Sequence, residues 1–139
     1  MVELPQGYGL LPITSEVSGR LGGADVKPFG DVFWFLSGGI EALARRISLA
    51  GAVAYLEAEI FGGTGTQAMV LWCGGEVCLG PAVTLFTSEV PDRLSSPQWA
   101  FNQAFRQLGA DRDGAFDEFE ALGLGRWRHT EDWVAGGPV

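Results

Sequence analysis

Two glycine pairs, Gly62-Gly63 and Gly74-Gly75, divide the middle of this chain into strands and turns. The second pair fits a two-residue hairpin loop, because glycine accepts the positive φ that such a loop needs at both positions. Residues 62–66 fit a five-residue loop between Phe61 and Gln67. This stretch is therefore predicted to form three antiparallel strands.

The simplest pairing of these strands gathers apolar side chains on one face. It places Leu56 opposite Trp72 and Ala58 opposite Val70. The predicted apolar face consists of Ala54, Leu56, Ala58, Ile60, Ala68, Val70, Trp72, Val77 and Leu79. The loop lengths and the two-residue period agree, which favours this register.

A phosphate-binding loop is the alternative explanation of the first glycine cluster. The segment "GGTGTQ" lacks the lysine of such loops, and a strand-like run follows it instead of a helical pattern. The cluster is therefore interpreted as a turn.

Apolar periodicity and capping residues predict helices outside this region. Ser37 and Ser96 are expected N-caps, and Gly51 and Gly109 are expected to end the same two helices. The predicted helices lie near residues 37–50, 97–108 and 115–122. The predicted strands lie near residues 52–61, 67–73, 76–79 and 82–87. The expected fold class is α+β, an antiparallel β-meander with helices packed on one face.

The length of 139 residues and the 47% of hydrophobic residues suit a single domain over residues 1–139. Residues 1–30 are rich in glycine and proline, so they are expected to form an irregular N-terminal segment. Short strands are possible there at Leu10–Thr14 and near Val17. The "DVFWFL" run at residues 31–36 fits either a buried strand or the start of a helix.

The net charge is −8. An acidic surface repels phosphate backbones, so no nucleic-acid partner is expected, and a protein partner with a basic surface fits better. No secretory signal and no uninterrupted apolar run long enough for a membrane span is found. A cytoplasmic location is predicted.

The two cysteines, Cys73 and Cys78, are predicted to be free thiols. In the register above they lie diagonally across a strand pair, about 7–8 Å apart, which is too far for a relaxed disulfide. Two cysteines do not make a four-ligand zinc site, so no metal or cofactor is expected.

Catalytic residues are sparse. His129 is the only histidine, and it lies among charged residues of the C-terminal segment. Glu57 and Glu59 share the second face of their strand, where they can be a carboxylate pair or simply a solvated surface. We expect no enzyme. A hydrolase or small-ligand-binding domain that uses His129, Glu57 and Glu59 is the alternative.

Residues 111–120 carry a second group of carboxylates. The "DRDG" at residues 111–114 resembles the start of a calcium loop but lacks the later ligands. Acids near the start of a helix are also favoured by its dipole. The predicted partner-binding residues are Glu57, Glu59, Asp117, Glu118 and Glu120.

Two motifs carry a resemblance to known proteins. "FGG-x-G-x-Q" at residues 61–67 and "LGLGR-x-R-x-TEDW" at residues 122–133 resemble those of small bacterial immunity-type proteins of toxin–immunity systems. The resemblance spans Ala52 to Trp133. It implies a protein that binds and neutralises a cognate toxin. A homodimeric structural subunit, with the second sheet face as its interface, is a further alternative.

Overall fold

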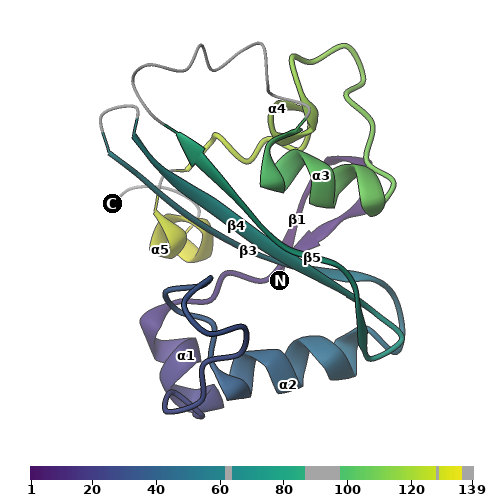
Figure 1. Ribbon diagram of the computed structural model, residues 1–139. Helices are drawn as coiled ribbons and strands as arrows, with labels where there is room; N and C mark the ends of the chain where they lie inside the picture. Colours follow the sequence, from purple (N-terminus) through teal and green to yellow (C-terminus); the bar gives the residue numbers. More distant parts are fainter. Residues whose placement is uncertain (62–63, 87–97, 128, 136–139) are drawn as a thin grey trace.

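The computed structural model describes residues 1–61, 64–86, 98–127 and 129–135. A three-stranded antiparallel sheet lies between two groups of helices (Figure 1). Its strands, in spatial order, are β3 (Val53–Phe61), β4 (Thr64–Cys73) and β5 (Glu76–Phe86). The predicted α+β class and the antiparallel meander are confirmed.

Helix α2 (Gly38–Ile47) covers one face of the sheet. The Ser37 hydroxyl caps it by accepting a hydrogen bond from the backbone N–H of Ile40, as the sequence predicts. Its buried Ile40 belongs to the same core cluster as Val70 and Trp72 of β4. Helix α1 (Ser15–Leu21) lies beside α2 on this side of the sheet (Figure 1).

Helices α3 (Ala100–Gln107) and α4 (Glu118–Ala121) lie on the opposite face. Met69 of β4 is fully buried against α3, whereas its neighbour Val70 packs toward α2. Successive strand residues point to opposite faces. The helices therefore cover both faces of the sheet, where the sequence placed them on one face.

The N-terminal segment has more regular structure than its composition suggested. It contains strands β1 (Val2–Glu3) and β2 (Gly9–Leu10), the short helix η1 (Pro5–Gly7) and helix α1. Val17, near which a strand was considered, lies in α1. The Tyr8 hydroxyl donates to the carbonyl of Leu108 at 2.9 Å, and Gln6 and Asp111 exchange two hydrogen bonds. These bonds attach the segment to the end of α3.

A last helix, α5 (Thr130–Ala135), follows near the C-terminus, where no helix was predicted. Among the described residues no helix is long and apolar enough to cross a membrane.

The predicted register between the first two strands is wrong by three residues. Val70 pairs with Tyr55, where Ala58 was expected, and Trp72 pairs with Val53. The pairing continues to Phe61 and Thr64, so only two residues separate the strands instead of five. An odd shift moves every side chain of one strand to the other face. Leu56 therefore packs toward α3, and Glu57 lies on the α2 face.

The prediction of two free thiols is also wrong. Cys73 pairs with Glu76 as expected, but Leu71 pairs with Leu79 instead of Cys78. This shift makes Cys78 the extra residue of a β-bulge, which breaks the regular diagonal spacing. The Cα atoms of Cys73 and Cys78 are 5.8 Å apart and the two residues form a disulfide. The two predicted strands at residues 76–79 and 82–87 form one strand, β5, through Phe86; Thr87 is outside the described residues.

Reduction of this disulfide is expected to lower the free energy of unfolding by about 2 kcal/mol, because the bond closes only a short loop. Urea unfolding of the wild type with and without reductant measures the change. The Cys73→Ser/Cys78→Ser double variant is the control and should show no response to reductant. Equal unfolding curves for the oxidised and reduced wild type would contradict the expectation.

Candidate partner-binding surface

Two neighbouring aromatic side chains project into solvent where the chain enters α2. Trp34 is 66% exposed and Phe35 is 71% exposed. The residues on either side of them, Phe33 and Leu36, are buried in the α2-side core. We call Trp34 and Phe35 the aromatic turn. Large exposed aromatic side chains next to each other are typical of sites that bind another molecule.

The Glu57 carboxylate fixes the backbone of the aromatic turn. Its Oε2 accepts a hydrogen bond from the Trp34 N–H and its Oε1 accepts one from the Phe35 N–H, each at 2.7 Å. Oε1 also accepts a hydrogen bond from the Tyr55 hydroxyl at 2.7 Å. Hydrogen bonds to a charged acceptor are stronger than neutral ones. Glu57 therefore holds both exposed aromatics in one backbone arrangement.

Tyr55 supports Glu57 from the core side. Its ring is buried and meets the ring of Phe33 edge to face, with centroids 5.4 Å apart. Burial raises the pKa of the Tyr55 hydroxyl well above its ordinary value, and the hydrogen bond and negative charge of Glu57 raise it further. The proton of Tyr55 is thus retained in the folded state.

This raised pKa predicts a loss of stability in alkali. The folded state holds the Tyr55 proton more tightly than the unfolded state. The contribution of the Tyr55 hydroxyl to the free energy of unfolding is therefore complete below about pH 10 and falls as the pH rises above that value. Tyr55→Phe should weaken the dependence of the unfolding free energy on pH in this alkaline range. Identical alkaline slopes for the wild type and Tyr55→Phe would refute the role of Tyr55.

Two exposed apolar side chains lie on the same face of the sheet, on its far edge strand. Across the three strands, Glu57 pairs with Ala68, and Ala68 pairs with Val83 of β5. Two residues further along β3, Glu59 pairs with Thr66, and Thr66 pairs with Leu85 of β5. Paired residues share a face, and two strand spacings amount to about 10 Å. Val83 is 48% exposed and Leu85 is 71% exposed. The aromatic surface is defined as Trp34, Phe35, Glu59, Val83 and Leu85.

The structure divides the five predicted contact residues between the two sides of the sheet. Glu57 and Glu59 share the α2 face. Glu57 is occupied by the hydrogen bonds to the aromatic turn, whereas Glu59 is exposed. The other three residues lie at α4 on the opposite side.

At α4 two of these carboxylates are buried. Asp117 and Glu118 are each 5% exposed. Asp117 caps α4 by accepting the Glu120 N–H at 2.8 Å, and it accepts a second hydrogen bond from the side chain of Asn102 at 3.1 Å. Glu118 pairs with Arg106 at 3.6 Å. Glu120 is exposed, and its carboxylate accepts the Phe116 N–H.

The catalytic alternative relied on His129, Glu57 and Glu59. His129 is exposed and, within the described residues, makes no ion pair with a carboxylate. The described residues contain no group of three side chains able to hold a metal ion. The hydrogen bonds of Glu57 show a structural use for its carboxylate.

No family model, curated protein or solved structure matches this chain.

Proposed function

We propose that this chain is a non-enzymatic binding protein that recognises a protein partner through the aromatic surface. The observation that carries the proposal is the aromatic turn, in which Glu57 holds the backbone of two exposed rings. Tryptophan and other large anchors contribute most of the affinity at protein interfaces. A turn that is already ordered loses little conformational entropy on binding.

The proposed partner has a basic surface. The chain carries a net charge of −8, and the exposed carboxylate of Glu59 lies within the aromatic surface. Opposite charges accelerate the encounter of two proteins and favour one orientation. Glu120, one of the predicted contact residues, would add an exposed carboxylate on the other side of the sheet. Asp117 and Glu118 would support α4 from inside and make no direct contact.

The resemblance of residues 52–133 to immunity-type proteins makes a cognate bacterial toxin the proposed partner. Binding would neutralise that toxin by covering its active site. Apolar anchors with an exposed carboxylate on the same face, in a chain of net charge −8, suit a target that itself binds a polyanion, such as a nuclease.

We place the protein in the cytoplasm, where a toxin that acts inside the cell would meet its inhibitor. The reducing systems of that compartment keep most cysteine pairs as thiols, so the Cys73–Cys78 bond would be open there. Alkylation of thiols in intact cells measures this directly. Two alkylated cysteines would support the cytoplasmic location, and a persistent disulfide would contradict it.

Capture of the partner from a native lysate, at low salt and at high salt, tests the proposed function. The expected result is one basic protein that is retained at low salt and lost in part at high salt, because ions screen the charge attraction. An empty capture at both salt concentrations would refute a stable protein complex.

A homodimer is the second candidate function. Strand β5 is an edge of the sheet, and Val83 and Leu85 on it are exposed. Exposed apolar edge strands can pair with a second copy of the same chain. Light scattering of the purified protein decides between the candidates, since a mass of one chain excludes a stable homodimer.

A further inference from the structure

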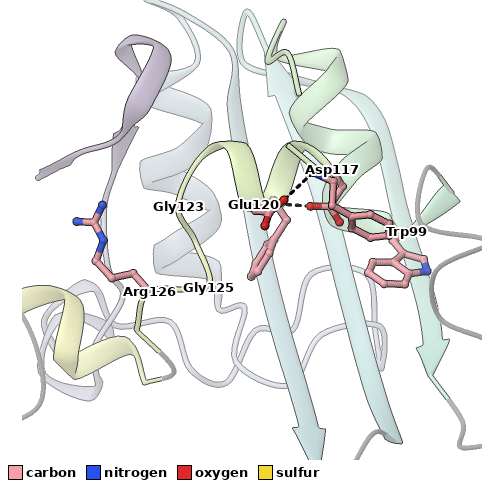
Figure 2. A pocket seen from close by; sticks show the side chains of 8 residues that line it. Trp99, Asp117, Glu120, Gly123, Gly125 and Arg126 are labelled. Atoms are coloured by element: carbon pink, nitrogen blue, oxygen red, sulfur yellow. Dashed lines mark hydrogen bonds between the residues drawn. The ribbon is translucent and has the colours of Figure 1, made fainter. Parts of the chain in front are cut away.

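A second surface, on the α4 side of the sheet, combines aromatic rings with carboxylates. Trp99, Phe116 and Phe119 line an open pocket with a volume of about 580 Å³, and Asp117 and Glu120 lie at its wall (Figure 2). This volume is in the range of sites that bind small molecules or single side chains. We call it the α4 pocket.

The α4 pocket is held by hydrogen bonds that start in the core. Asn102 is fully buried, and its side chain donates to the Asp117 carboxylate and accepts the Phe119 N–H. Asp117 in turn accepts the Glu120 N–H, and Glu120 accepts the Phe116 N–H. The ring of Phe119 also packs on the buried Phe101, with centroids 6.3 Å apart. The aromatic and acidic groups are therefore positioned before any ligand arrives.

The charges of the α4 pocket favour a cation. Glu120 keeps acceptor capacity after its bond to Phe116, because a carboxylate offers about four lone-pair positions. Arg126 is the one cationic side chain among the lining residues within the described part of the chain. It lies at the far side from Trp99, and its guanidinium points away from the rings (Figure 2). An anion would meet the exposed carboxylate of Glu120 first.

We propose that the α4 pocket binds an organic cation, such as a guanidinium or an alkylammonium group, between its aromatic rings and Glu120. Aromatic faces attract cations, and this attraction strengthens when the cation is partly removed from water. A metal ion would not use the rings, whereas a guanidinium group can stack on them and pair with a carboxylate. The cation can be an arginine side chain of another protein or a free quaternary ammonium compound.

Titration of the full chain with two probes tests this site, with backbone amide and indole NMR signals as the readout. The probes are the tripeptide Gly-Arg-Gly and tetramethylammonium chloride, and sodium chloride serves as the ionic-strength control. We expect saturable shifts at the Trp99 indole and the Phe116 amide, with dissociation constants in the millimolar range. Tighter binding of the tripeptide would identify a protein side chain as the source of the cation. Tighter binding of tetramethylammonium would identify a small molecule.

Two variants with matched controls separate the site from a general charge effect. Glu120→Gln keeps an oxygen for the Phe116 N–H, and Phe116→Leu removes a ring that is 45% exposed. Each should weaken probe binding about tenfold. Glu59→Gln and Phe35→Leu make the same changes on the opposite face of the sheet and should leave probe binding at the α4 pocket unchanged. Shifts that do not saturate, that sodium chloride reproduces, or that survive in both pocket variants would overturn the proposal. This titration requires no partner bound to the aromatic surface, so its result is independent of whether the proposed function is correct.

Discussion

Replacing Asn102 with leucine is expected to lower the free energy of unfolding by about 3 kcal/mol. Asn102 is a fully buried residue of α3, and both ends of its amide make hydrogen bonds to residues at α4. It donates to the carboxylate of Asp117 and accepts the Phe119 N–H. Leucine has a similar size but leaves a buried negative charge without this donor. Removing one partner of a buried charged group costs more than the hydrogen bond itself contributes.

Gln107→Leu is the matched control for this variant. It converts an exposed amide of the same helix into the same apolar side chain, and such surface changes usually alter stability by less than about 0.5 kcal/mol. Urea unfolding of the wild type and both variants measures the difference. Similar destabilisation by the two substitutions would show that Asn102 has no special role in joining α3 to α4.

Replacing Glu57 with alanine is expected to lower the free energy of unfolding by about 2 kcal/mol and to loosen the aromatic turn. Three donors lose one acceptor group: the Trp34 and Phe35 amides and the Tyr55 hydroxyl. The amides lie near solvent and can bond to water, which limits the cost. Their hydrogen exchange should become faster, because the bonds that protect them are gone.

Glu59→Ala removes the same charge from the same face of β3 and is the control for Glu57→Ala. Glu59 is exposed, so its loss should leave both stability and exchange at Trp34 and Phe35 nearly unchanged. Equal effects of the two variants would mean that Glu57 acts only as a surface charge, as the sequence alone suggested.

The α+β class could be predicted because glycine pairs, capping residues and apolar periods agree along most of the chain. The register between β3 and β4 could not be predicted. The run from Gln67 to Trp72 is buried at every position, since helices cover both faces of β4. A strand buried on both sides has no polar face to fix its register from sequence. The disulfide was missed because the bulge at Cys78 interrupts the regular pairing on which the predicted spacing of the two cysteines rested.

The structural roles of the predicted contact residues also depend on neighbours that are distant in the sequence. Glu57 accepts hydrogen bonds from residues 22 and 23 positions earlier in the chain, and no local pattern reveals such a partner. Trp34 and Phe35 lie in an apolar run that hides which members are exposed. Asp117 and Glu120 had a usable signal, since an acid followed three residues later by glutamate is a pattern of helix N-termini. That pattern could have indicated a structural role for Asp117.

The most direct test of the proposed function is the affinity of the captured partner for a Trp34→Ala/Phe35→Ala variant. We expect binding to weaken at least about 100-fold, because two central aromatic anchors are removed. Folding should be preserved, since both side chains are largely exposed. Leu49→Ala is the control, because Leu49 is 71% exposed but lies outside the aromatic surface. An unchanged affinity of the double variant would contradict a partner site at the aromatic turn.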